Sequence, residues 1–159
     1  MTQTFKSIDR RHVLGLVASG AALWTTRARG ETLPHVLVYR NPTCGCCHKW
    51  VEHLISNGFD VTVRDAPNLK PIKDALGVPA ELASCHTAQV GRYVVEGHVP
   101  AAAIKKLLSD KPDGRGLAVP GMPIGSPGME GGEPEIYDVI LFGAGAQRSY
   151  GRYREDKLI

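Results

Sequence analysis

The part of the chain after residue 30 lacks the surplus of positive charge that the overall composition suggests. Its 159 residues include 19 lysines and arginines against 16 aspartates and glutamates. Five of the basic residues but only one acidic residue fall within residues 1–30, which leaves 14 basic and 15 acidic residues in the remainder. A nearly neutral domain offers no basic surface to a phosphate backbone, so the composition argues against a nucleic-acid-binding protein.

The sequence also lacks an apolar run long enough to cross a bilayer. The uncharged stretch at residues 13–26 is shorter than the roughly 20 residues that a spanning helix requires. Arg10-Arg11 precedes this stretch, and Ala28-Arg29-Gly30 ends it in the small-x-small manner of a cleavage site. We therefore predict an export signal at residues 1–30, with membrane contact only during export, and one folded domain at residues 31–159. A membrane anchor is the alternative.

The pair Arg10-Arg11, followed by Val13 and Leu14, resembles a twin-arginine signal. That resemblance implies export of an already folded protein to the periplasm.

Cysteine is scarce, and a second C-x-x-C motif is missing. Three of the four cysteines occupy Cys44-Gly45-Cys46-Cys47, and Cys85 stands alone before a histidine. The missing motif argues against a zinc ribbon. Three thiols within four residues close almost no loop, so structural disulfides among them would add little stability. The cysteines instead indicate chemistry, namely binding of a thiophilic metal, disulfide exchange, or both.

The spacing of apolar residues predicts strands that alternate with helices. Predicted strands cover residues 35–40, 59–64, 87–90, 93–96 and 137–142. Helices are predicted to begin within the cysteine tetrad, near Pro67 and at Pro100. Residues 111–135, with seven glycines and five prolines, read as a long loop before the last strand. No secondary structure is predicted for the polar tail after this strand.

This order predicts a thioredoxin-like α/β fold with its core at residues 35–142. A parallel β-α-β half would join an antiparallel hairpin in a mixed four- to five-stranded sheet flanked by helices. The C-x-x-C after the first strand supports this plan. The first helix would turn one apolar face inward, made of Cys47, Trp50, Val51, Leu54 and Ile55.

The helical phase gives the clustered cysteines different environments. Cys47 should point inward, whereas Cys44 should lie more exposed at the helix amino end, where the helix dipole lowers a thiol pKa. In a dithiol mechanism Cys44 would attack and Cys47 would resolve the mixed disulfide. Cys46 has no place in that mechanism, but a third thiolate suits a soft Cu(I) ion. Zinc also binds thiolates and remains a weaker alternative.

The third predicted strand lacks the proline that thioredoxin-like redox enzymes normally carry in cis at its start. The residues there are Ser84-Cys85-His86-Thr87. In a thioredoxin-like fold this junction lies beside the amino end of the first helix, so Cys85 should bring a fourth sulfur to the tetrad. The alternative is that Cys85 is a buried apolar residue.

Secondary ligand candidates are Met122, Met129, His48 and His86. The two methionines lie in the glycine- and proline-rich loop, where their thioethers could bind Cu(I) or simply pack. His48 follows the tetrad and could be a ligand or a solvated helix residue. His86 adjoins Cys85, and because neighbours on a strand point to opposite faces, we expect only one of the two to face the metal and favour Cys85. His98 precedes a predicted helix; it is not assigned as a ligand, but its role should be tested.

Four motifs together resemble a known family. They are PTCGCC at residues 42–47, ELASCHT at 81–87, VEGHVP at 95–100 and GLAVPGMPIGSPGM at 116–129. In this order they are similar to the motifs of the CopG-like copper-resistance family. The resemblance implies a thioredoxin-like periplasmic protein that takes part in copper redox handling and binds copper through Cys44, Cys46, Cys47 and Cys85.

The leading hypothesis is therefore a periplasmic protein of copper resistance and homeostasis that holds Cu(I) in a cysteine cluster. Copper chaperones or efflux proteins would be its partners. The rival is a thiol–disulfide oxidoreductase that acts on proteins through Cys44 and Cys47. The sequence leaves open whether the protein is an enzyme.

Overall fold

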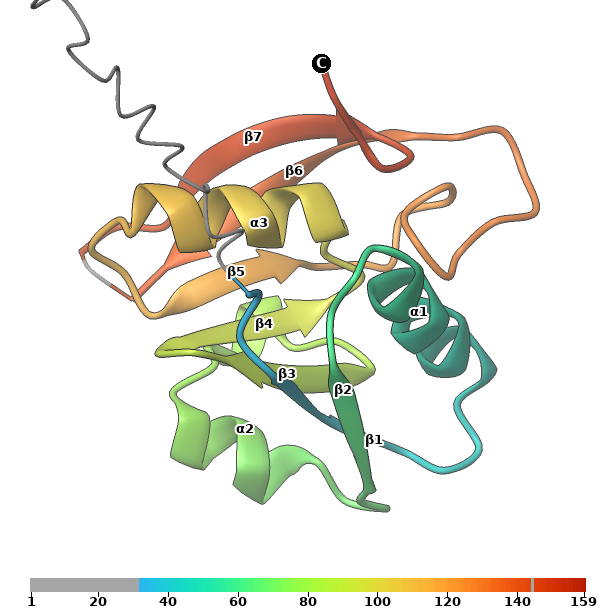
Figure 1. The fold of residues 1–159 in the computed structure, drawn as a ribbon, viewed down its shortest axis with the longest axis vertical. Coiled ribbons are helices and arrows are strands. Elements are labelled where there is room, and N and C mark those ends of the chain that lie inside the picture. The colour runs from blue at the N-terminus through green and yellow to red at the C-terminus, as the bar shows by residue number, and fades with distance from the viewer. Residues whose placement is uncertain (1–31, 144) are drawn as a thin grey trace, which may run out of the picture. The chain divides into compact units, whose positions relative to one another are not determined.

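A mixed sheet of eight strands organises the molecule. The computed structural model describes residues 32–143 and 145–159, so the predicted export signal at 1–30 lies outside the described residues. The strands follow the order β2-β1-β3-β4-β5-β6-β7-β8 across the sheet, and helices pack against it (Figure 1). The mixed α/β class agrees with the prediction, but the sheet has more than the predicted four or five strands.

The first four strands arise where the sequence predicts them. β1 (Val36–Arg40) pairs in parallel with β2 (Val61–Asp65) and antiparallel with β3 (His86–Val90). β4 (Tyr93–Gly97) completes a tight hairpin with β3. Gly91 has φ +54° in the connecting turn, a conformation that favours glycine. This half of the sheet therefore joins a parallel β-α-β unit to an antiparallel hairpin.

The second half of the sheet departs from the prediction. β5 (Gly116–Val119) lies within the predicted loop at residues 111–135 and pairs in parallel with β4. β6 (Ile136–Phe142) is the predicted last strand, and it pairs with β5 and with β7 (Arg148–Arg154). The two-residue β8 (Lys157–Leu158) follows at the edge. The tail without a predicted assignment thus extends the sheet by two strands.

Helices cover both faces of the sheet. On one face, α1 (Gly45–Ser56) and α3 (Ala101–Asp110) contribute to the larger apolar core, which includes Val95 of β4. Val94, the preceding residue of the same strand, belongs to a smaller cluster on the opposite face with Leu76 of α2 (Lys70–Leu76). A short 3₁₀ turn, η1 (Ala80–Leu82), leads from α2 toward β3.

The first helix confirms most of its predicted inward face. Cys47, Trp50, Val51 and Leu54 are buried, and Asn57 caps the carboxyl end before Gly58. Ile55 was predicted to point inward, but it is 54% exposed, so this prediction is wrong. A position at i+8 from Cys47 lies at the margin of the apolar stripe. Among the described residues, no helix is both long and apolar enough to span a membrane.

Candidate functional site

The turn between β1 and α1 presents three sulfur atoms. Cys44 is the N-cap of α1, and its Sγ accepts the backbone N–H of Cys47 at 3.4 Å. Cys47 is fully buried and forms a disulfide with the half-buried Cys44. These placements match the predicted exposure of the two residues. Cys46 and Cys85 are free.

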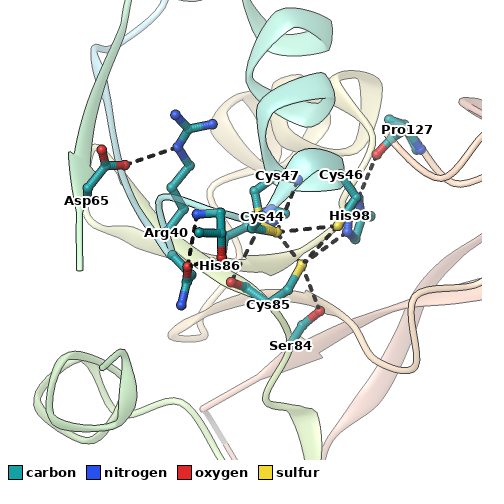
Figure 2. The surroundings of a disulfide bond; sticks show 12 residues. Arg40, Cys44, Cys46, Cys47, Asp65, Ser84, Cys85, His86, His98 and Pro127 are labelled. Atoms are coloured by element: carbon teal, nitrogen blue, oxygen red, sulfur yellow. Dashed lines mark hydrogen bonds and ion pairs between the residues drawn. A yellow bond between two sulfur atoms is a disulfide. The ribbon is translucent and has the colours of Figure 1, made fainter. Parts of the chain in front are cut away.

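The fold brings the distant Cys85 to this turn, as the topology predicted. Its Sγ lies 3.9 Å from Cys46 Sγ, and Cys46 Sγ lies 3.4 Å from Cys44 Sγ. Cys47 Sγ lies 3.6 Å from the carbonyl oxygen of Cys85. All four sulfur atoms lie within 4.8 Å of one another (Figure 2). Such a group of donors is compact enough to share one or more soft ions once it is reduced.

The segment that carries Cys85 is held by a buried carboxylate. The described residues contain no cis peptide bond. Instead, Glu96 on β4 accepts the backbone N–H of Ser84 through Oε1 at 2.5 Å. The same oxygen accepts a hydrogen bond from Lys73 Nζ at 2.5 Å, and Oε2 accepts one from the Thr87 hydroxyl at 2.7 Å. This network holds the backbone of Ser84 before Cys85 and the side chain of Thr87 after it.

Gly97 allows this segment to approach β4 closely. Its φ is +71°, and a Cβ at this position would lie 2.7 Å from Ser84 Oγ and 2.6 Å from the carbonyl oxygen of Val119. Any larger residue would push the Ser84–Cys85 segment away from the sheet.

Two buried histidines stand beside the Cys85 thiol. His86 Nδ1 lies 3.3 Å and His98 Nε2 3.2 Å from Cys85 Sγ, and neither ring is exposed. The expectation that Cys85 and His86 turn to opposite faces is therefore wrong. Strand alternation does not apply to this pair, because β3 begins at His86 and Cys85 lies in the preceding bend.

A backbone carbonyl sets the tautomer of His98. Its Nδ1 lies 2.8 Å from the carbonyl oxygen of Pro127. A carbonyl only accepts, so Nδ1 carries the proton and Nε2 presents a lone pair to the site. This is the arrangement that metal-binding histidines commonly adopt.

The loop that holds His98 also covers the first turn of α1. Residues 125–128 are buried, although they belong to no strand or helix. A Cβ on Gly128 would lie 2.7 Å from the carbonyl oxygen of Cys46 and 3.1 Å from His98 Nδ1. The loop backbone therefore packs directly against the helix turn that bears the sulfurs, in a place where only glycine fits.

Burial shifts the titration of the groups in the site. Burial, followed by the neighbouring Cys46 thiol, raises the pKa of Cys85 to about 12. Burial also lowers the pKa of His98, and it lowers the pKa of His86 well below the ordinary value with a further contribution from His98. Both imidazoles are thus neutral at pH 7 and available as ligands, whereas a metal ion would have to displace the Cys85 proton.

The remaining predicted candidates lie in different surroundings. His48 is exposed on α1, with Nε2 3.3 Å from the carboxylate of Glu52. Met122 is 40% exposed and has φ +50°. Met129 is half-buried, and its backbone N–H donates to the carbonyl of Ser126. Met122 and Met129 stay predicted candidates as ligands.

Sequence reasoning gave little weight to three residues that the structure places at the site. His98 lies just beyond β4, and its signals in the sequence were its place before a helix start and within the VEGHVP motif. Neither Lys73 of α2 nor Glu96 of β4 was predicted to contribute to the site. An isolated charge within an otherwise apolar strand such as β4, YVVEG, was the available signal for Glu96.

A family profile and two solved structures match this chain. A family profile described as "Protein of unknown function, DUF411" matches residues 82–129, which include Cys85, His98 and the covering loop. No curated protein matches the chain. Two solved structures are similar over 76% of this chain and 98% of their own, each with a TM-score of 0.71. They are described as copper resistance protein copG, Form 1 and Form 2, and are 43% and 44% identical to this chain. With that identity over nearly the full length of its relatives, the chain belongs to the CopG-like copper-resistance family.

Proposed function

We propose that this chain is an exported, periplasmic protein that binds Cu(I) through Cys44, Cys46, Cys47 and Cys85 and so contributes to copper resistance. The names of its relatives and the cysteine cluster indicate a copper-related function. The proposed exported domain begins near residue 31 and has a thioredoxin-like core. Support for that core comes from the parallel β1–β2 pair, the antiparallel β3–β4 hairpin and the C-x-x-C after β1.

The approach of Cys85 to the tetrad is the observation that carries the proposal. The four sulfurs converge within 4.8 Å from segments 39 residues apart. A disulfide exchange motif requires two cysteines, whereas four converging thiolates form a soft donor set that suits a thiophilic cation such as Cu(I). The same thiolates also suit zinc, which is the weaker alternative.

Copper binding by all four sulfurs requires the reduced protein. The Cys44–Cys47 disulfide accepts two electrons and two protons from a dithiol reductant and yields two thiols. In the opposite direction, two Cu(II) ions each accept one electron from this dithiol. The products are two Cu(I) ions, the disulfide and two protons. The site can therefore couple copper redox change to thiol chemistry, and chaperones or efflux proteins would exchange the Cu(I).

Titration of the reduced protein with Cu(I) against a chromophoric Cu(I) chelator tests the proposal. We expect the Cys44→Ser/Cys46→Ser/Cys47→Ser variant to lose more than about 100-fold in affinity, because loss of an outer-shell residue alone commonly costs 10–100-fold. Thiolate-to-Cu(I) absorption in the ultraviolet should fall in parallel. The matched control is His35→Gln, which removes an exposed histidine just before β1, at the opposite end of this strand from the tetrad, and should bind as the parent does. A triple variant with undiminished affinity would reject the proposal.

A thiol–disulfide oxidoreductase is the second candidate, and the Cys44–Cys47 disulfide is the observation that favours it. The more exposed Cys44 would attack a substrate disulfide, and the buried Cys47 would release the product.

Insulin reduction by a dithiol reductant separates the two candidates. An oxidoreductase should lose its activity in Cys44→Ser and keep it in Cys46→Ser, because Cys46 is outside the disulfide. For a protein dedicated to copper we expect no acceleration over the reductant alone in any variant. Turnover that survives Cys46→Ser and disappears in Cys44→Ser would favour the oxidoreductase.

A further inference from the structure

The imidazole of His53 joins the last turn of α1 to the start of α3. The backbone N–H of Ala101, the first residue of α3, donates to His53 Nε2 at 3.0 Å. The N-cap residue of α3 is Pro100, which makes no side-chain capping hydrogen bond. Because the first N–H groups of a helix have no partner within the helix, His53 of one helix acts as a cap for the next. A backbone N–H only donates, so Nε2 is unprotonated and Nδ1 carries the proton of the neutral ring.

A second contact from α1 holds the same connection. Trp50 lies one turn before His53 and donates its Nε1–H to the carbonyl oxygen of Val99 at 2.9 Å. The two contacts flank Pro100 and hold the chain where β4 leads into α3. Only the histidine contact responds to pH, because the indole N–H is a donor that does not titrate.

A cavity beside His53 offers a protonated ring other partners. The cavity has a volume of about 460 Å³, and its lining includes His53, Glu130 and Asp156. Glu130 follows the loop that covers the first turn of α1, and Asp156 lies in the turn between β7 and β8. The other charged residues of the lining are Glu155 and Lys157.

We propose that His53 is a pH-sensitive switch at the start of α3: the neutral ring accepts the N–H of Ala101, and the protonated ring releases it and turns into the cavity toward the carboxylates of Glu130 and Asp156. Protonation converts Nε2 into a donor, which would then face another donor. It also places a cation at the amino end of α3, where the helix dipole disfavours positive charge, whereas the last turn of α1 favours it. The switch requires no metal ion and does not depend on the proposed function.

The groups around His53 set the pH range in which the switch operates. Burial has the largest effect and lowers the pKa of His53, and Lys105 of α3 lowers it further, whereas Asp156 and Glu130 raise it; the net shift is downward. In the unfolded chain the pKa of a histidine is about 6.5. The contribution of this contact to stability is therefore complete above about pH 6.5 and is lost as the pH falls through the folded-state pKa. Acidification would loosen the connection from β4 to α3, which also carries His98.

NMR of the metal-free, disulfide-closed protein tests the switch. At neutral pH the imidazole nitrogen shifts of His53 should identify Nε2 as the unprotonated nitrogen. Between about pH 7.5 and about pH 4.5, the hydrogen-exchange protection of the Ala101 amide should fall at least about fivefold, because one hydrogen bond is lost. His53→Gln keeps an acceptor near the position of Nε2 but does not titrate, so the same change should stay below about twofold. Since His86 and His98 also titrate below the ordinary range, the difference between the two proteins assigns the effect to His53.

Substitutions in the cavity test the partners of the protonated ring. Glu130→Gln and Asp156→Asn should each move the titration of His53 to lower pH, because each removes a negative charge that stabilises the imidazolium. Lys105→Gln should move it to higher pH. These shifts distinguish a switch from a histidine that merely packs between two helices, and they do not depend on how well His53→Gln folds.

His48→Gln is the matched control, because it removes an exposed histidine of the same helix. It should leave both the titration of His53 and the protection of the Ala101 amide unchanged. Three results would each overturn the proposal: a proton on His53 Nε2 at neutral pH, an equal loss of Ala101 protection in the parent and in His53→Gln, or a His53 titration that neither carboxylate substitution moves.

Discussion

Replacing Glu96 by alanine should lower the free energy of unfolding by about 3–5 kcal/mol, because it leaves a buried ammonium group without its partner. Glu96 is fully buried, and Lys73 is 9% exposed. The same substitution removes the acceptor of the Ser84 N–H and of the Thr87 hydroxyl. Each of these groups then faces the cost of an unsatisfied buried donor. Urea denaturation of the disulfide-closed protein measures the loss.

Two further variants serve as controls for the Glu96→Ala substitution. Lys70 and Asp74 form an exposed i, i+4 pair on the same helix, so Lys70→Ala should change stability by less than about 0.5 kcal/mol. The double variant Lys73→Met/Glu96→Gln replaces two charges by neutral side chains and keeps an acceptor for Ser84. It should be more stable than Glu96→Ala. A loss below about 1 kcal/mol for Glu96→Ala would contradict the assignment of a buried, mutually dependent pair.

This pair also bears on the position of the fourth sulfur. The Glu96 carboxylate accepts the N–H of Ser84, the residue before Cys85, and the hydroxyl of Thr87, two residues after it. A charged anchor, the Lys73–Glu96 pair, holds this segment. Removing the Glu96 carboxylate should therefore move Cys85 away from Cys46 as well as destabilise the fold.

Trp50→Ala is the second substitution for which we expect a large effect, a loss of about 3–5 kcal/mol. Trp50 is fully buried in the larger core, and its Nε1–H donates to the carbonyl oxygen of Val99 at 2.9 Å. Its ring packs on His86 at a tilt of 34°. Truncation removes the packed volume, leaves the Val99 carbonyl unpaired and frees the His86 ring. Denaturation in urea at fixed oxidation state provides the measurement.

Two further variants of α1 separate these contributions. Trp50→Phe retains a ring against His86 but loses the donor to Val99, so its cost should fall well below that of alanine. Ile55→Ala truncates an exposed residue of the same helix and should cost less than about 0.5 kcal/mol. If Trp50→Ala cost no more than Ile55→Ala, the role of the indole in the core would be refuted.

The sequence predicted the first half of the sheet because local signals there agree with one another. Strand β1 alternates buried and partly buried residues, and glycines with positive φ end α1 and α2. By contrast, β5 is a run of four buried residues between glycine- and proline-rich segments, which is too short for any period to show. β7 buries only Tyr153 fully and is otherwise polar, so its existence depends on pairing with β6 rather than on its own composition.

At the site, the sequence predicted which cysteines meet but not what surrounds them. Topology alone placed Cys85 beside the tetrad, because the junction before β3 lies at the amino end of α1. Lys73 and Glu96 are 23 residues apart, and neither carries a local signal that it pairs with the other in the interior. The orientation of His98 depends on the carbonyl of Pro127, 29 residues away. Such contacts exist only after the sheet has formed.

In the proposed function, the bond between Cys44 and Cys47 would link metal occupancy to the supply of electrons. Under the proposed function, Cu(I) binds only the dithiol form at these two sulfurs, and a ligand that binds one redox form stabilises that form by mass action. Each tenfold excess of free Cu(I) over its dissociation constant would then raise the midpoint potential of the couple by about 30 mV per ion bound. A rising Cu(I) concentration would keep the protein competent to bind Cu(I) in surroundings that otherwise close the disulfide.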